Sequence, residues 1–509
     1  MKDEEKLIQE KDEDIIRESN VKMGRVTDTT LEKIEELKES QTTEQKKLSS
    51  FQIVFSIWNT MIGSSIVSIP YNVYCTGIIP TIFIGLLYGF ICYLTCAVVV
   101  RLGGKEEEFA VIVYKYFYYG FGPRAAKVGR IMQITFNLMI NTGATFIYFL
   151  IINQNLYPCI CLFLRIFKVD LDGEDITPYF DRFSLFYCAL LVSCIVFPLT
   201  ILREMHFLAK FNSYGIYFVS ALLIFVIYTG IKSLATDTFH FEYMENIEGS
   251  KDRNLFLFGT NPGILTGTLS IGMFCHSVIL PLMKNNRNPK NNQRDLFLGY
   301  VCVTLTYIII GIMGYIGFSG SDYSPDFKQN WFRFFKSDNY FILVLRILNV
   351  IQLTSIFPIL FYVVRTQLFT TFFKSYLKKK AAIIIFSVSL LCLCIIILYL
   401  CYDILGKLIA YIGAGTALIL VYTIAPLMNM INYYIRHLPK QDLIKLKEAK
   451  DENEISINVD ELVPLNPWKA FIFYLSMMLI IVLGIITLLL QIVTVNFFGI
   501  VIEENDLIK

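Results

Sequence analysis

The sequence predicts an all-α membrane protein that crosses the bilayer many times and contains two interrupted helices. Three observations support this prediction. Of the 509 residues, 55% are hydrophobic and only 17% are charged, whereas soluble domains carry about 25% charged residues. Apolar stretches of about 18 residues or more, each long enough to cross the hydrocarbon core, recur along the chain. Two of these stretches are broken by small residues and proline, around Gly63 and around His276.

The apolar stretches separate into eleven predicted membrane spans. The eighth is long enough to tilt or to project past the bilayer. The spans lie at 51–75, 78–100, 129–157, 184–202, 211–232, 261–283, 296–318, 340–371, 381–401, 406–433 and 468–495.

The loops between the spans differ in charge, and this difference predicts the orientation of the chain. The loops rich in arginine and lysine face the cytosol in multispanning proteins. We therefore expect the N-terminus in the cytosol and, with an odd number of spans, the C-terminus outside the cell or in a lumen. The cations on the cytosolic side are Arg101, Lys105, Lys115, Arg124, Lys127, Arg130, Arg203, Lys210, Lys284, Arg287, Lys290, Arg294, Arg365, Lys374 and Lys378–Lys380.

The two ends of the chain lie outside the spans. Residues 1–50 are polar and charged, so we expect a cytosolic, mostly disordered tail. The transmembrane domain follows at 51–495, and a short non-cytosolic tail at 496–509. The first tail is either a solvated segment or a docking segment for a cytosolic protein partner. Its Asp3–Ile8 stretch fits an acidic dileucine pattern, which favours a vacuolar or lysosomal membrane over the plasma membrane.

Two connecting segments have a distinct composition. Residues 105–127 mix aromatic and basic side chains, which is typical of an amphipathic helix on the inner leaflet, so membrane lipid is an expected partner. Residues 435–466 are polar, and we expect them to be loosely structured.

The two interrupted spans indicate where a ligand binds. In hydrocarbon every backbone N–H and C=O needs a partner, so a helix is interrupted only where it lines a protected cavity. Matched interruptions in the two halves of a multispanning protein are the sequence signature of a transporter's binding site. The first reads Trp58-Asn59-Thr60-Met61-Ile62-Gly63-Ser64-Ser65 and closes at Pro70, and the second reads Gly272-Met273-Phe274-Cys275-His276-Ser277 and closes at Pro281.

An amino acid fits the chemistry of these breaks. Its carboxylate needs free backbone N–H groups and the positive end of a helix dipole, which Gly63–Ser65 would supply beside small side chains. Its ammonium needs carbonyl oxygens, which an unwound Phe274–His276 would leave free. Phe274 either covers the pocket or packs as an ordinary aromatic. His276 is either a proton or substrate contact or a satisfied buried imidazole.

The eighth span contains a further group of polar residues. Gln352-Leu353-Thr354-Ser355 precedes Pro358. Adjacent hydroxyls in an apolar helix either bond to carbonyls of their own helix or offer hard oxygen ligands to a cation, and the residues alone leave both interpretations open. Arg346, in or near the outer end of the same span, is either a functional charge or a snorkelling side chain.

Three segments together resemble the amino acid/auxin permease family. They are Asn59–Ser65, Phe274–Pro281 and Leu353–Pro358, and they are most similar to the sodium-coupled neutral amino acid transporters. The stretch from Lys284 to Asp295 is similar to the loop after helix six in the lysosomal arginine-sensing member of that group. The resemblance covers residues 51–495.

The resemblance implies a fold of five helices plus five in inverted repeat, as in LeuT-like amino acid permeases, with an eleventh helix. The turn that meets the substrate carboxylate in the family falls on Gly63-Ser64-Ser65, although its third small residue here is serine rather than glycine. The residues that correspond to the family's sodium site are Asn59, Thr354 and Ser355, completed by carbonyls near Trp58 and Met61.

We therefore expect a secondary active amino acid transporter, a symporter with sodium as the coupling ion. Two alternatives stay open: an endolysosomal amino acid sensor that signals through its N-terminal tail, and a proton-coupled amino acid transporter. Apart from Asp403 at a helix edge, no Asp or Glu lies well inside a span, which favours sodium over protons.

The remaining patterns argue against other classes of protein. The twelve cysteines lie mostly inside predicted spans, as buried apolar thiols do, although a non-cytosolic disulfide at Cys159 or Cys161 stays open. No Cys/His cluster has the spacing of a metal site, so we expect no metal beyond the sodium ion and no other cofactor. The sequence contains no nucleophile–base pair of the kind that indicates an enzyme, and no filter-like repeat of the kind that indicates a channel. We also expect no nucleic-acid partner.

Overall fold

The computed structural model describes residues 47–506, except for 64, 105–107, 167–182, 203–204, 237–238, 243–252, 260, 320–330, 335–339, 374–378, 401–412 and 439–465. Contacts divide the chain after Ser49, and the part from Ser50 onwards forms a compact unit. The dileucine pattern, Asp403 and most of the polar segment 435–466 lie outside the described residues.

The described part from Ser50 onwards is almost entirely helical, because a chain in hydrocarbon must satisfy its backbone hydrogen bonds within each segment. Two spans consist of two helices separated by a break. The first contains α2 (Ser50–Ile62), a 3-10 turn (Ser65–Val67) and α3 (Ile69–Thr76). The sixth contains α9 (Pro262–Gly272) and α10 (Ile279–Lys284).

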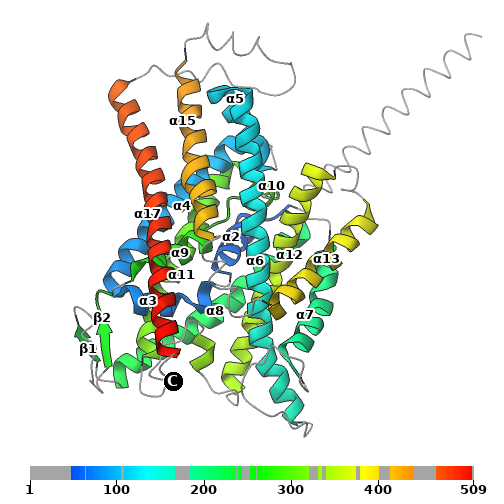
Figure 1. Cartoon of the computed structure of the whole chain (residues 1–509), viewed down its shortest axis with the longest axis vertical. Helices are drawn as coiled ribbons and strands as arrows, with labels where there is room; N and C mark the ends of the chain where they lie inside the picture. The colour runs from blue at the N-terminus through cyan, green and yellow to red at the C-terminus, as the bar shows by residue number, and fades with distance from the viewer. Residues whose placement is uncertain are drawn as a thin grey trace, which may run out of the picture. The chain divides into compact units, whose positions relative to one another are not determined.

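The other spans are continuous helices, and several of the long ones run in roughly the same direction (Figure 1). One of them, Gly413–Arg436, includes a π-helical turn at Leu420–Ile424 and α15 (Ala425–Arg436). The others are α4 (Ile78–Gly103), α6 (Pro123–Ile166), α7 (Leu185–Thr200), α8 (Met205–Thr236), α11 (Asn292–Phe318), α12 (Tyr340–Phe372), α13 (Lys380–Leu400) and α17 (Pro467–Asp506).

Described helices lie within each of the eleven predicted spans, although residues 406–412 of the tenth lie outside the described part. Eight of them are single helices long and apolar enough to cross a membrane, and α7 is a shorter apolar helix. With the two broken spans, this arrangement is a multispanning membrane protein, as predicted.

Some boundaries differ from the prediction. The helix α6 runs over 44 residues, beyond both ends of the predicted span 129–157, because a helix can continue after it leaves the hydrocarbon. The predicted amphipathic helix is shorter: α5 covers Phe109–Phe121, and it ends at Gly122, which has a φ of 86°. A short parallel pair, β1 (Phe239–Glu242) with β2 (Arg253–Phe256), was not expected. Cys159 and Cys161 form no disulfide within the described residues.

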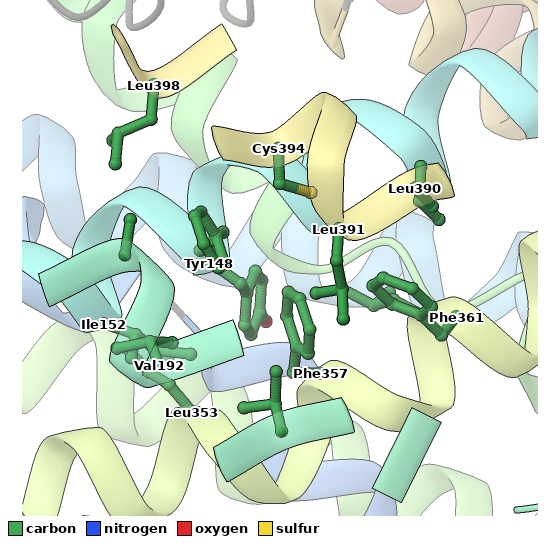
Figure 2. Close-up of a cluster of buried hydrophobic side chains, with 14 of the residues drawn as sticks. Tyr148, Ile152, Val192, Leu353, Phe357, Phe361, Leu390, Leu391, Cys394 and Leu398 are labelled. Carbon is green, nitrogen blue, oxygen red and sulfur yellow. The ribbon is translucent and has the colours of Figure 1, made fainter. Parts of the chain in front are cut away.

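A cluster of buried apolar side chains holds α6, α7, α12 and α13 together (Figure 2). The ring centroids of Phe149 in α6 and Phe357 in α12 lie 6.2 Å apart, and Phe361 packs 4.9 Å from Phe357. Leu353 belongs to the same cluster. Because α12 also contacts α8 and α2, this packing fixes which residues of α12 face the first broken span.

Candidate functional site

The first break begins at Gly63, immediately after α2. Gly63 has a φ of 39°, a left-handed conformation that residues with a side chain rarely adopt. A Cβ at this position would overlap the hydroxyl oxygen of Tyr148 from α6. The position therefore requires glycine both for its backbone angle and for the close approach of Tyr148. Ser64 lies outside the described residues.

The second break covers Met273–Val278, between α9 and α10. Within the described residues, the backbone N–H groups of Cys275, His276 and Ser277 have no acceptor. The Cys275 carbonyl accepts hydrogen bonds from Val278 N at 3.0 Å and Ile279 N at 2.9 Å. The break thus leaves free donors in a buried position, where unpaired backbone groups are costly unless a ligand or water satisfies them.

The two breaks meet at Ser65 and Gly272. A Cβ on Gly272 would lie 2.9 Å from Ser65 Oγ and 2.6 Å from the hydroxyl of Tyr307 in α11. The Tyr307 hydroxyl donates to the Met61 carbonyl at 2.7 Å and lies 3.2 Å from the Ile62 carbonyl. Tyr307 thus satisfies carbonyls at the broken end of α2, and it lies where the second break approaches the first.

A buried network of amides and hydroxyls connects α2, α8 and α12 beside the first break. Asn59 Nδ2 donates to Asn212 Oδ1 at 2.7 Å and to Ser355 Oγ at 2.9 Å. Asn59 Oδ1 accepts from Gln352 Nε2 at 3.1 Å. All four side chains are 2% exposed or less. Such a network, fully satisfied in a low-dielectric interior, fixes the relative positions of three helices.

Close helix packing makes this network possible. Asn212 Nδ2 donates to Ser56 Oγ at 2.8 Å and to Thr60 Oγ1 at 2.7 Å, on the same side of α2 as Asn59. A Cβ on Gly215 of α8 would overlap Asn59 Nδ2 and lie 2.7 Å from Ser355 Oγ. Glycine at this position therefore lets α8 approach both α2 and α12.

The structure brings together only part of the predicted sodium site. Asn59 and Ser355 are in direct contact, but the amide presents its nitrogen to the serine. Ser355 also donates to the Gln352 carbonyl of its own helix at 2.6 Å. Thr354 is half-buried and its hydroxyl has no hydrogen bond within the described part of the chain. Trp58 and the Met61 carbonyl face α11 instead, since Trp58 Nε1 donates to Thr306 Oγ1 at 3.1 Å.

The side chains of the second break face α4, α11 and α6. His276 Nε2 lies 3.0 Å from Thr95 Oγ1, and the His276 Nδ1 atom has no partner within the described residues. Phe274 stacks on the imidazole with ring centroids 5.4 Å apart. Cys275 Sγ lies 3.6 Å from Cys96 Sγ of α4. The imidazole is therefore buried, but only one of its two nitrogens has a partner. It matches neither a fully satisfied buried imidazole nor a demonstrated proton or substrate contact.

Arg346 is buried, with 6% of the residue's surface exposed. Its Nη2 donates to the Phe332 carbonyl at 2.9 Å, which ties α12 to the short turn Trp331–Phe334. Burial contradicts the snorkelling alternative, because a snorkelling side chain would reach the surface.

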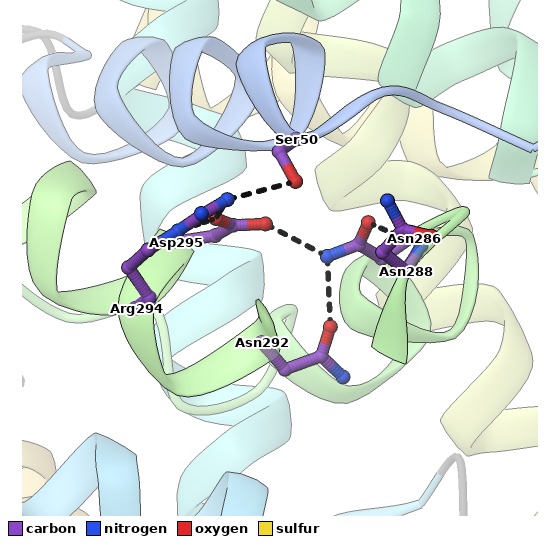
Figure 3. Close-up of polar contacts among 6 residues, drawn as sticks. All are labelled: Ser50, Asn286, Asn288, Asn292, Arg294 and Asp295. Atoms are coloured by element: carbon purple, nitrogen blue, oxygen red, sulfur yellow. Dashed lines mark hydrogen bonds and ion pairs between the residues drawn. The ribbon is translucent and has the colours of Figure 1, made fainter. Parts of the chain in front are cut away.

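A buried carboxylate, which the sequence alone does not reveal, lies at the start of α11 beside the loop that follows α10. Asp295, in the first turn of α11, is fully buried. Its Oδ1 accepts from Arg294 Nη2 at 2.9 Å, and its Oδ2 accepts from Asn286 Nδ2 at 2.9 Å (Figure 3). Arg294 Nη2 also donates to Ser50 Oγ at 3.3 Å. The loop is thus tied to the start of α2.

Several residues of the site were not identified from the sequence: Tyr148, Asn212, Gly215 and Tyr307. Each is a single polar residue or glycine inside a long apolar helix. Buried polar side chains in membrane spans usually mark ligand pathways or helix contacts, and this signal could have pointed to Asn212 in particular.

Comparison with known proteins gives the same family as the sequence motifs. The chain is 28% identical over 433 residues to neutral amino acid transporter 9 of Danio rerio, covering 76% of this chain and 75% of the relative. It is 24% identical over 429 residues to the sodium-coupled neutral amino acid transporter 9 homolog of Caenorhabditis elegans, covering 74% and 67%.

The fold matches a solved transporter. Mhp1, a nucleobase-cation-symport-1 family transporter in a closed conformation, superimposes with a TM-score of 0.53 at 12% identity, over 89% of this chain and 93% of Mhp1. This match confirms the predicted LeuT-like fold of five helices plus five. The family model for the transmembrane amino acid transporter protein matches residues 46–449. Since that match covers most of the chain, the protein belongs to the transmembrane amino acid transporter family, as the resemblance indicated.

Proposed function

We propose that this amino acid transporter is a sodium-coupled symporter that works by alternating access, with the two broken helices moving around a shared site. The observation that carries the proposal is the meeting of the breaks at Ser65 and Gly272, directly beside the network of Asn59 and Ser355. An ion and a substrate bound there would share the broken end of α2. Each would then order the backbone that the other needs, which is a reciprocal coupling free energy.

In this proposal the substrate carboxylate binds Gly63, Ser64 and Ser65. The positive end of α3 favours an anion at this position, and the Tyr148 hydroxyl fills the space beside Gly63 itself. The substrate ammonium binds at the second break, where Phe274, Cys275 and His276 contribute backbone and ring surface. The free N–H groups of Cys275 and His276 are donors and cannot pair with the ammonium, which in this proposal bonds to carbonyl oxygens of the break.

Sodium in this proposal binds oxygen atoms of Asn59, Thr354 and Ser355, with carbonyls near Trp58 and Met61. Since Asn59 turns its nitrogen to Ser355 in this structure, we expect its amide to rotate when sodium binds. Thr354, whose hydroxyl has no hydrogen bond within the described residues, is then a ready ligand. A relative whose name includes "sodium-coupled" supports this ion.

The proposed orientation places the N-terminus in the cytosol and the C-terminus outside or in a lumen, because arginine and lysine accumulate on one side. A vacuolar or lysosomal membrane is proposed on the acidic dileucine pattern at Asp3–Ile8. The N-terminal tail is proposed to bind a cytosolic protein.

One experiment tests the function. The purified chain is reconstituted in proteoliposomes, and uptake of each of the twenty radiolabelled amino acids is measured with and without a sodium gradient and with and without a pH gradient. Uptake that needs sodium supports the proposal. Uptake driven by the pH gradient alone would favour proton coupling, and His276 is then the residue to test. No uptake under any condition would overturn the transport mechanism.

A further inference from the structure

A pocket lined by both polar and apolar side chains lies beside the second break, on the side predicted to face the cytosol. Its enclosed volume is about 70 Å³, below the roughly 300–1,000 Å³ of most small-molecule pockets, so it suits a small ligand that reaches into the open space at its mouth. The wall is formed by the start of α5, by α6, by α10 and by α12. Ser277 of the second break and Pro281 of α10 also line it, so the pocket adjoins the proposed substrate site.

A stripe of polar residues on α6 leads from this pocket to the breaks. Gln133, Asn137, Asn141 and Thr145 follow one another at intervals of four residues, which places them on one face of the helix. All four are buried. Tyr148, which approaches Gly63, follows at the end of the stripe.

Hydrogen bonds connect the stripe to the second break. Ser277 Oγ donates to Asn141 Oδ1 at 3.2 Å, and Asn141 Nδ2 donates to Asn137 Oδ1 at 2.9 Å. Asn137 Nδ2 donates to Gln367 Oε1 of α12. Gln367 Nε2 lies 3.5 Å from Gln133 Oε1. Buried polar side chains inside a membrane span are costly and usually line a ligand pathway.

At the pocket end of this stripe, the Gln133 Nε2 donor and the Glu108 carboxylate have no partner among the described residues. Gln133 is fully buried, and its Nε2 donor has no hydrogen bond within the described residues. Glu108, at the start of α5, lines the same pocket and has no ion pair with any described cation. A buried amide donor without an acceptor costs about 1–3 kcal/mol, so a pocket that keeps one is suited to a ligand that supplies the acceptor.

We propose, on the basis of the amino acid transport proposed above, that this pocket is a second binding subsite, on the inner side, for a zwitterionic amino acid. Glu108 pairs with the substrate ammonium, and Gln133 Nε2 donates to its carboxylate. The polar stripe of α6 connects the subsite to the breaks, and the substrate occupies it while it enters or leaves on that side.

The test measures the two sides of the membrane separately. Proteoliposomes are sorted by orientation, and the KM for the amino acid that the wild-type chain carries fastest is measured with substrate on the inner side and then on the outer side. Glu108→Gln should raise the inner-side KM about tenfold, which corresponds to about 1.4 kcal/mol, and leave the outer-side KM unchanged. Glu108→Asp, which keeps the charge, should restore most of the inner-side affinity.

Gln133→Leu provides the second arm, since it removes only the carboxylate donor. Inner-side inhibition by the N-acetyl derivative of the same amino acid, which keeps the carboxylate but lacks the ammonium, should be lost in Gln133→Leu and kept in Glu108→Gln. The matched control is Gln491→Leu, another buried glutamine with an unpartnered atom, on α17. It should change neither KM.

The outcomes separate this subsite from the proposed function. Suppose that the wild-type chain transports normally, and that Glu108→Gln and Gln133→Leu change the KM equally on both sides or change neither KM. The subsite is then wrong, and the transport mechanism stays intact. A wild-type chain that carries no amino acid would overturn both.

Discussion

At the scale of single residues, the site depends both on the missing side chain of Gly63 and on the side-chain hydroxyls of Thr354 and Ser355. Gly63 has a left-handed φ and faces the hydroxyl of Tyr148. Ser355 touches Asn59, while its neighbour Thr354 has no hydrogen bond within the described part of the chain. Single substitutions at these positions therefore separate the contribution of backbone shape from the contribution of side-chain oxygens.

Gly63→Ala should abolish amino acid uptake, because the added methyl group overlaps the Tyr148 hydroxyl and the residue loses easy access to positive φ. The measurement is uptake in proteoliposomes at equal amounts of reconstituted protein. Gly143→Ala is the control, since a Cβ at Gly143 of α6 meets no atom within 4 Å. Normal uptake by Gly63→Ala would contradict the carboxylate assignment.

Thr354→Ala and Ser355→Ala should each raise the sodium concentration for half-maximal uptake by about fivefold or more, since the loss of one buried polar partner costs about 1 kcal/mol. Sodium titrations of uptake give this value directly. Ser387→Ala, which removes a buried hydroxyl from α13, should leave it unchanged. An unchanged sodium response in both variants of α12 would remove these hydroxyls from the cation site.

At the scale of helices, α2 is held between α8, α11 and α12 by polar contacts rather than by apolar surface alone. Asn212 of α8 bonds to Ser56, Asn59 and Thr60, and Tyr307 of α11 bonds to the last carbonyls of α2. Hydrocarbon gives little driving force for helix association, so small residues and polar contacts decide which helices pack closely.

Gly215→Ala should push α8 away from α2 and reduce both stability and uptake, because its Cβ overlaps Asn59 Nδ2. Overpacking of this kind costs about 1–3 kcal/mol. Thermal unfolding of the purified protein in detergent measures the loss. Gly415→Ala, where a Cβ meets nothing within 4 Å, is the matched control and should unfold like the wild type.

Asp295→Ala should destabilise the loop between α10 and α11, since Asn286 Nδ2 then loses a buried acceptor and Arg294 loses its ion pair. Asn286 Nδ2 keeps its second acceptor, Asn292 Oδ1, so we expect a loss of about 1 kcal/mol from the one N–H left without a partner. Arg294 is largely exposed and adds little. The same thermal assay checks this. An unfolding temperature equal to that of the wild type would show that the buried carboxylate is not needed for the loop.

At the scale of the whole molecule, ion and substrate are proposed to meet at one broken helix, which makes their binding reciprocal. The factor by which sodium raises the affinity for the amino acid must equal the factor by which the amino acid raises the affinity for sodium. Equilibrium binding of the radiolabelled amino acid at several sodium concentrations, and the reverse titration, measure both factors. If sodium leaves amino acid affinity unchanged, the shared site is wrong.

The sequence predicts the architecture well because hydrocarbon imposes simple rules on it. The eleven spans follow from apolar length, and the two breaks follow from Gly63 and His276 within such lengths. The partners of the site could not be predicted in the same way. Asn212 and Tyr307 meet α2 only through the tertiary arrangement of α8 and α11, and one sequence does not specify which helices become neighbours. The direction of the Asn59 amide depends on that same arrangement.

The contact between Cys96 and Cys275 has a practical consequence. One thiol belongs to the continuous helix α4 and the other to the second break, and the sulfur atoms lie 3.6 Å apart in a buried position. We expect a movement that separates the break from α4 to part the two thiols and admit water to Cys275. The molecule therefore contains a natural reporter of its own cycle: the rate at which a water-soluble maleimide labels Cys275 would record the opening of the pathway without an introduced probe.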